Sequence, residues 1–222
     1  MKEEGFQVSQ WDHSMFLLRK DGQVEPVGVV AVSTDDIIWG GESEVTQAME
    51  SFRTTFKIEA WDEASTAPVR FVGADVRQDL SAGTVSVSQG TYTTAMASMP
   101  AVDGDGTTPM TGMQITACKS GLGAVNWPAT QTRPDLGAES AILCSAMSRD
   151  PTLRTYREIA ALVERAKATP RGLVLNGLRK SADLDVVLFH DASWRSLIGD
   201  GSQGGWIAVA TAAGAITQEA LM

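Results

Sequence analysis

The sequence contains little cysteine and histidine and no long hydrophobic run. Its two cysteines, Cys118 and Cys144, lack the spacing of metal ligands, so we expect reduced thiols rather than a disulfide framework or a zinc site. No apolar run reaches the roughly 20 residues of a membrane span, and the opening residues MKEE do not resemble a signal peptide. The composition, 43% hydrophobic and 20% charged, is typical of a globular chain. We therefore expect an intracellular protein, cytoplasmic or nuclear, that does not span a membrane.

Positive charge is also scarce, because 18 basic residues stand against 27 acidic ones and the net charge is −9. Phosphate contacts are made by Lys and Arg, so this balance argues against a general nucleic-acid binder. Residues 149–180 are the exception, since they hold eight basic and three acidic residues and carry a net charge of +5. This segment is predicted either to follow a phosphate backbone or to form an ordinary solvated helix face.

Two adjacent carboxylates, Asp35 and Asp36, interrupt the most strand-like stretch of the chain, residues 27–41. The apolar runs on both sides are rich in Val and Ile and end at Gly40-Gly41, a pattern that predicts two strands. Neighbouring carboxylates repel each other, and a divalent cation with oxygen ligands neutralises such a pair. The stretch therefore predicts either a cation site at a hairpin tip or an ordinary Asp-Asp turn.

The remaining pattern predicts an α+β protein. Apolar runs indicate strands at residues 14–18, 24–32, 37–39, 71–76, 84–88, 184–190 and 206–210. Apolar residues at helical spacing indicate helices at residues 42–56 and 150–169, and further helices are predicted to open at residues 91 and 134. Residues 100–112 are rich in Gly, Asp, Thr and Pro, which is typical of a loop or linker.

Several short blocks, taken in order, resemble the Pol polyprotein of copia-type retrotransposons, from late reverse transcriptase to the start of RNase H. The most specific block is A-T-Q-T-R-P-D at residues 129–135, because it resembles the run that joins the two enzymes in that family. The others are D-H-S-M-F (12–16), T-D-D-I-I (34–38), F-V-G-A-D-V (71–76), V-S-V-S-Q-G-T-Y (85–92), H-D-A-S-W (190–194) and S-Q-G-G-W (202–206). Together they cover nearly the whole chain.

The resemblance implies an α+β fold made of a partial palm-like antiparallel sheet with a helix, a helical connection and a truncated RNase H-like hairpin. It places the C-terminal part of reverse transcriptase in residues 1–99, a linker and helical connection in 100–180, and the start of RNase H in 181–222. The implied activity is RNA-directed DNA polymerisation by two-metal nucleotidyl transfer, with RNase H, in an element that also carries out DNA integration. The implied partners are an RNA template, a DNA primer, an RNA–DNA hybrid and the rest of the polyprotein.

The resemblance also assigns candidate site residues, and the implied cofactor is Mg²⁺ or Mn²⁺. The catalytic and metal-binding candidates are Asp35, Asp36 and Asp191. The candidates for nucleic-acid contact are Phe71, Gly73, Gln89, Tyr92, Arg133, Arg154 and Arg157.

The family's remaining carboxylates have no counterpart in this sequence. The early polymerase Asp would lie before residue 1, and the later RNase H acids would lie after Met222. Ser33 also stands where the family usually has an aromatic residue. We therefore expect weak metal binding and no robust catalysis by this chain alone.

Two other interpretations remain. One is a non-catalytic remnant that binds nucleic acid or protein through the region 71–92 and the basic helix at 150–169. The other is an unrelated metal-dependent hydrolase that uses the Asp-Asp turn. A hydrolase would lose activity in an Asp35→Asn variant, whereas a binding remnant would be indifferent to that change.

Overall fold

The computed structural model describes residues 4–177, 184–197 and 201–212. It divides into two compact units, Met1–Gln78 and Asp79–Met222, which are described in turn. The units combine helices with antiparallel strand pairs, so the predicted α+β class is confirmed. The predicted boundaries at residues 99 and 180 stay predictions.

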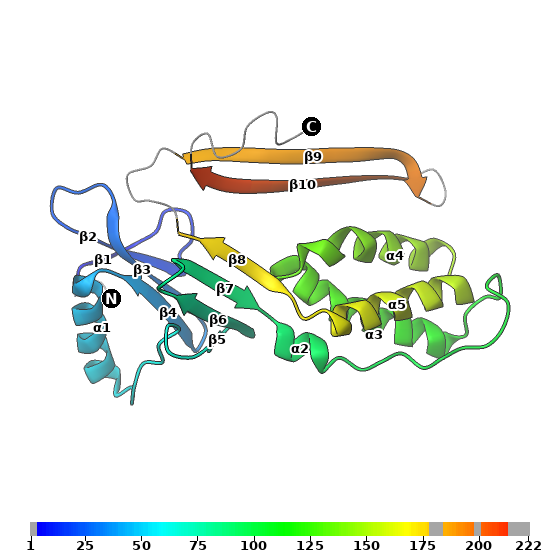
Figure 1. Ribbon diagram of the computed structural model, residues 1–222, viewed down its shortest axis with the longest axis horizontal. Coiled ribbons are helices and arrows are strands. Elements are labelled where there is room, and N and C mark those ends of the chain that lie inside the picture. Colours follow the sequence, from blue (N-terminus) through cyan, green and yellow to red (C-terminus); the bar gives the residue numbers. More distant parts are fainter. Residues whose placement is uncertain (1–3, 178–183, 198–200, 213–222) are drawn as a thin grey trace. The chain divides into compact units, whose positions relative to one another are not determined.

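The first unit is built on a four-stranded antiparallel sheet in the order β1-β2-β3-β4 (Figure 1). The strands are β1 Phe6–Val8, β2 Met15–Arg19, β3 Pro26–Ser33 and β4 Asp36–Gly41. Val30, at the centre of β3, pairs with Phe16 on one side and Trp39 on the other, and it is fully buried. The predicted strands at 14–18, 24–32 and 37–39 are therefore confirmed, with shifts of a few residues at their ends.

Helix α1, Ser43–Phe56, packs against this sheet through Val45 and Met49, which are both fully buried. The helix approaches β3 at Gly28, where an added Cβ would lie 1.9 Å from Val45 Cγ2. Glycine at this position therefore allows the close contact between helix and strand. The helix ends at Lys57, whose left-handed backbone conformation closes the last turn.

The prediction of one strand over residues 71–76 is wrong. The chain instead forms two antiparallel strands, β5 Val69–Phe71 and β6 Ala74–Asp79. They are joined by Val72 and Gly73, which have φ values of 47° and 75°. Two consecutive positive φ values define the tight turn that suits the twist of a hairpin. The sequence conceals this turn because valine rarely adopts positive φ.

The second unit begins with β7 Thr84–Ser88, which pairs antiparallel with β8 Gly172–Asn176. Strand β7 and the short helix α2, Gly90–Thr94, were predicted, whereas β8 was not. Residues 100–110 form no helix or named strand. They nevertheless contact the helices, because Thr108 O and Gly106 O accept hydrogen bonds from the backbone N–H groups of Leu153 and Arg154.

Three helices, α3, α4 and α5, pack side by side in the second unit (Figure 1). Their bounds are α3 Gly112–Gln131, α4 Gly137–Arg149 and α5 Leu153–Ala168, with a short 3-10 turn at Pro134–Leu136 before α4. The core between them includes the buried residues Cys118, Leu122, Leu143, Ile159, Leu162 and Val163. The apolar stripe of α5 was predicted, whereas the whole of α3 was missed.

The C-terminal strands form a separate antiparallel hairpin of β9 Leu184–Leu197 and β10 Gly201–Ala212. Both strands were predicted, and both are longer than the apolar runs that indicated them. His190 pairs with Trp206, and Leu188 pairs with Ala208. Among the described residues, no helix has the length and apolar character needed to cross a membrane.

Candidate metal and nucleic-acid sites

The Asp35-Asp36 pair lies at the tip of the β3–β4 hairpin in the first unit. Ser33 pairs with Asp36, so Thr34 and Asp35 alone form the turn. Thr34 has a φ of 52°, and both aspartates are exposed to solvent. The hairpin therefore presents two neighbouring carboxylates at an open tip, as the sequence predicted.

The two aspartates differ in their surroundings. Asp36 Oδ2 accepts a hydrogen bond from the backbone N–H of Val72, at 3.0 Å, in the turn between β5 and β6. Asp35 lies within the turn itself and is exposed to solvent. One carboxylate is thus held by a second hairpin, and the other extends from the tip.

This pair alone does not fit a complete magnesium site. Mg²⁺ prefers octahedral oxygen coordination and keeps its water unless several ligands are arranged around it. Within the residues that the structure describes, no group of three or more His, Cys, Asp or Glu side chains could hold a metal ion. The pair can supply part of a coordination shell, and further ligands would have to come from a substrate or another segment.

The third carboxylate candidate, Asp191, lies in β9 opposite Gly205 of β10. Its side chain lies outside the part of the chain whose side chains are described. Its assignment as an RNase H carboxylate therefore stays a prediction.

The residues predicted to contact a primer divide between the two units. Phe71 and Gly73 belong to the β5–β6 hairpin and are partly buried. In the second unit, Gln89 is only 2% exposed and accepts a hydrogen bond from Thr132 Oγ1 at 3.0 Å. Tyr92 donates its hydroxyl hydrogen to Ala124 O and packs edge-on against Trp127. Gln89 and Tyr92 therefore join β7 and α2 to helix α3.

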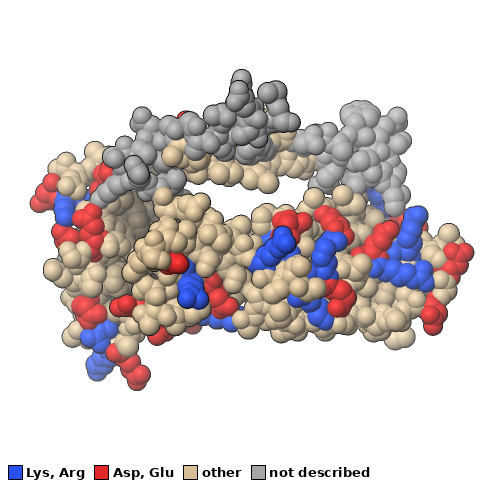
Figure 2. All heavy atoms as spheres, viewed as in Figure 1, with Lys and Arg blue, Asp and Glu red and all other residues tan. Residues whose placement is uncertain are grey.

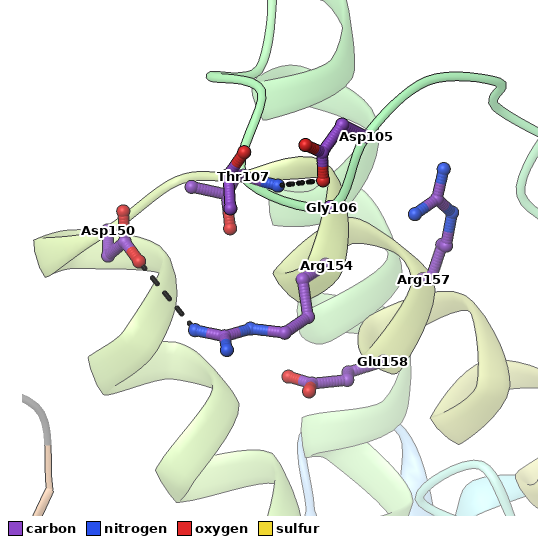
Figure 3. A pocket seen from close by; sticks show the side chains of 8 residues that line it. Asp105, Gly106, Thr107, Asp150, Arg154, Arg157 and Glu158 are labelled. Atoms are coloured by element: carbon purple, nitrogen blue, oxygen red, sulfur yellow. Dashed lines mark hydrogen bonds and ion pairs between the residues drawn. The ribbon is translucent and has the colours of Figure 1, made fainter.

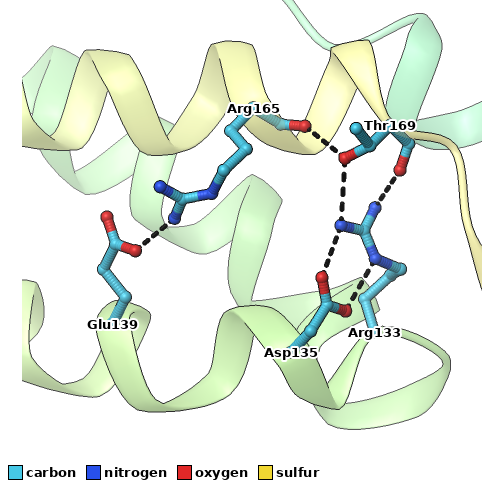
Figure 4. Close-up of polar contacts among 5 residues, drawn as sticks. All are labelled: Arg133, Asp135, Glu139, Arg165 and Thr169. Atoms are coloured by element: carbon cyan, nitrogen blue, oxygen red, sulfur yellow. Dashed lines mark hydrogen bonds and ion pairs between the residues drawn. The ribbon is translucent and has the colours of Figure 1, made fainter.

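Arg133, also predicted to contact nucleic acid, is buried at the end of the helical bundle with 1% of its surface exposed (Figure 4). Its guanidinium donates to both carboxylate oxygens of Asp135, at 2.8 Å each. It also donates to the carbonyl oxygen and the hydroxyl of Thr169, just beyond α5. The planar fork of arginine suits these simultaneous bonds. The side chain of Arg133 thus links the start of α4 to the end of α5 through hydrogen bonds. These contacts give Arg133 a structural role.

Arg154 and Arg157 line a cavity of about 510 Å³ at the start of α5 (Figure 3). The side chain of Arg154 is 65% exposed and lies 3.9 Å from Asp150. Arg157 donates to Gly104 O at 2.6 Å and to Val102 O at 3.4 Å. Asp105, Asp150 and Glu158 also line the cavity, so its lining holds two guanidinium groups and three carboxylates. A phosphate would meet repulsion as well as attraction in this cavity.

The other basic side chains of α5 also have acidic neighbours. Arg165 pairs with Glu139 of α4, and Lys167 pairs with Glu164 at 3.3 Å. Figure 2 shows basic and acidic atoms intermixed over the helical bundle. Within the described part of this segment, residues 149–177, the basic side chains therefore do not form a continuous basic surface on this face.

Sequence reasoning missed two groups that organise these regions: the backbone N–H of Val72, which donates to Asp36, and the oxygens of Thr169, which accept from Arg133. No residue type marks either one, because each acts through a contact between segments distant in sequence. Comparisons with protein-family models, curated proteins and solved structures found no match for this chain.

Proposed function

We propose that this chain is a segment of a copia-type retrotransposon Pol polyprotein, comprising the C-terminal part of a reverse transcriptase and the start of RNase H. The parent enzyme is an RNA-directed DNA polymerase that uses Mg²⁺ or Mn²⁺ and acts on an RNA template and a DNA primer in the cytoplasm or nucleus. In this proposal the β3–β4 sheet belongs to a polymerase palm, and the β9–β10 hairpin opens an RNase H-like domain.

The observation that carries the proposal is the place of Asp35 and Asp36 at the tip of an antiparallel hairpin. Two-metal nucleotidyl transfer needs carboxylates that are held by a rigid sheet and open to a bulky substrate. Asp35 and Asp36 would hold part of the metal shell, and a cation held there would supply charge stabilisation for the attacking and leaving oxygens. This chain contributes the pair of carboxylates, and its sheet fixes their backbone. Two carboxylates are too few for two ions, so we expect no primer extension by the chain alone.

The test is primer extension on an RNA template with Mg²⁺. It compares this chain with a polypeptide extended by the coding sequence that precedes it in frame. We expect extension only by the longer polypeptide, and loss of it in Asp35→Asn. Asp21→Asn, which changes another exposed turn aspartate, is the matched control. Extension that survives Asp35→Asn, or a longer polypeptide without activity, would contradict the proposal.

Binding without catalysis is the second candidate. It is favoured by large apolar side chains that remain exposed on β9 and β10, among them Val186 at 75% and Trp206 at 74%. Fluorescence anisotropy with a labelled RNA–DNA hybrid, measured over a range of salt concentrations, tests its nucleic-acid form. This candidate predicts salt-dependent binding that weakens when Arg154 and Arg157 become alanine. It also predicts the same affinity in the Asp35→Asn variant.

A further inference from the structure

Helix α5 begins with a residue suited to capping it, but the cap bond is not formed. Thr152 is the N-cap residue, and its φ of −106° and ψ of 166° give it the extended backbone of that position. A threonine hydroxyl there accepts a hydrogen bond from the second or third helical N–H, as the Thr111 hydroxyl does from Gln114 at the start of α3. Thr152 Oγ1 accepts none, and this buried oxygen has no hydrogen-bond partner among the described residues.

A segment distant in sequence satisfies the start of α5 instead. We call residues 100–110 the strap. Its carbonyl oxygens at Thr108 and Gly106 accept hydrogen bonds from the backbone N–H groups of Leu153 and Arg154, at 2.9 and 3.0 Å. The first four N–H groups of a helix have no partner within it, so the strap satisfies two of them. Arg154 is the second helical residue, so Gly106 O holds an N–H group that an N-cap hydroxyl otherwise accepts.

The strap is fixed at its two ends and lies open to solvent between them. Pro100 O accepts a hydrogen bond from the Tyr156 hydroxyl at 2.9 Å, and Met110 is buried in the helical core. Between these ends most strap residues are exposed, and only Val102 and Gly106 are partly buried. A segment with so few buried contacts opens at low free-energy cost while the rest of the fold stays intact.

One side chain holds the middle of the strap to α5. Arg157 donates to Gly104 O at 2.6 Å and to Val102 O at 3.4 Å. Arg154 lines the same cavity (Figure 3), but its guanidinium lies 3.9 Å from Asp150. The two arginines share their charge and their helix, and the side-chain hydrogen bonds to strap carbonyls come from Arg157. They therefore form a matched pair for testing what this anchor does.

We propose that the middle of the strap opens from α5 while its ends stay in place, and that the Thr152 hydroxyl then caps the helix. Gly106 O accepts the Arg154 N–H in the closed state, and Thr152 Oγ1 accepts it in the open state. Opening also frees the guanidinium of Arg157, so the strap controls whether that group is available to a ligand at the start of α5. Opening of the strap is independent of the proposed polymerase ancestry.

Hydrogen exchange of single amides, measured by NMR in the full chain, tests the opening. Each rate is expressed relative to the rate of the same residue in an unfolded chain. We expect Leu153 and Arg154 to exchange much faster than Val163, in the buried middle of α5, because opening exposes only the start of the helix. Arg154 should exchange about fivefold more slowly than Leu153, because the Thr152 hydroxyl protects it in the open state.

Two variants of Thr152 test the change of cap. Thr152→Val removes the hydroxyl that stabilises the open state, so Leu153 should exchange about fivefold more slowly. The difference between Leu153 and Arg154 should disappear as well. Thr152→Ser keeps a capping hydroxyl and should resemble the wild-type chain. Faster exchange at Leu153 in Thr152→Val would show that the hydroxyl supports the closed state, and it would overturn the proposal.

Two arginine variants test the anchor. Arg157→Met removes the bonds to the strap and should speed exchange at Leu153 and Arg154 about tenfold. Arg154→Met, the matched control, should leave the rate at Leu153 unchanged. Unchanged rates in Arg157→Met would contradict the anchor. Equal protection of Leu153 and Val163 in the wild-type chain would overturn the proposal, because the strap would then open only when the whole second unit unfolds.

Discussion

Val72 combines a β-branched side chain with a φ of 47°, a conformation that favours glycine or asparagine. We expect Val72→Asn to stabilise the first unit by about 1 kcal/mol. Asparagine adopts positive φ with less strain than valine, and it keeps the backbone N–H that donates a hydrogen bond to Asp36. Gly73→Ala, at a φ of 75°, should instead destabilise it by a similar amount. Urea unfolding followed by tryptophan fluorescence measures both changes. A loss of stability in Val72→Asn would show that the valine side chain matters more than its backbone strain.

Arg133 is a buried basic residue that donates hydrogen bonds to both Asp135 and Thr169. Replacing it with methionine leaves the carbonyl oxygen of Thr169, in a partly buried residue, without this donor. Since Asp135 is itself half exposed, we expect a cost of about 2 kcal/mol, below that of breaking a fully buried pair. Arg165→Met removes an exposed pair with Glu139 and should cost less than about 1 kcal/mol. Equal costs in urea unfolding would contradict the structural role of Arg133.

The same contact predicts a pH dependence. The hydrogen bonds from Arg133 hold the pKa of Asp135 below its ordinary value. A lowered carboxyl pKa contributes stability above the unfolded value of about 3.9, and that contribution disappears as the pH falls through the folded value. The stability difference between wild type and Arg133→Met should therefore shrink between about pH 5 and about pH 2. Urea unfolding midpoints of both proteins across this range test it, and a constant difference would exclude the linkage.

At the scale of elements, the contact between α1 and β3 depends on Gly28. A Cβ at this position would lie 1.9 Å from Val45 Cγ2, whereas one at Gly40 would meet nothing within 4 Å. We expect Gly28→Ala to destabilise the first unit by about 1–3 kcal/mol through overpacking. Gly40→Ala, on the neighbouring strand, should be neutral or slightly stabilising. Thermal unfolding of the two variants gives the comparison, and a neutral Gly28→Ala would mean that α1 can shift without cost.

The elements that sequence reasoning found are those with one buried face. Helix α5 shows its apolar stripe because one side packs on the bundle, and β3 shows a Val-rich run because its side chains are buried there. Helix α3 was missed because it packs against both α4 and α5, so its apolar residues do not form a single stripe. It also contains Gly121, where a Cβ would come within 3.0 Å of Met99 Sδ, and Pro128 near its end. Helix α3 thus contains a glycine and a proline, two residue types that disfavour a helix when judged from the local sequence alone.

Separation along the chain decides which positions of the candidate residues could be predicted from the sequence. Asp35 and Asp36 could be placed at a hairpin tip because both flanking strands are local in sequence. The burial of Arg133 could not be predicted, because it depends on Thr169, which lies 36 residues further along the chain. An arginine in a motif carries no sign of whether it faces solvent or a neighbouring helix end. Contacts between segments distant in sequence decide whether the arginine is buried. Such contacts cannot be recognised in a single sequence.

At the scale of the whole molecule, the β9–β10 hairpin predicts self-association. Successive strand residues point to opposite faces, so Val186 and Leu188 share one face with Trp206, and Ile207 and Val209 lie on the other. All five side chains are more than a third exposed. Exposed apolar faces of this size promote association.

We therefore expect the weight-average mass in sedimentation equilibrium to rise with concentration. The double variant Val186→Lys/Leu188→Lys should suppress the rise, because the lysines would repel one another across a shared face. Val24→Lys, at an exposed residue of the first unit, is the matched control and should not suppress it. A wild-type chain that stays monomeric at high concentration would contradict the expectation. It would mean that the exposed apolar side chains of β9 and β10 do not drive association.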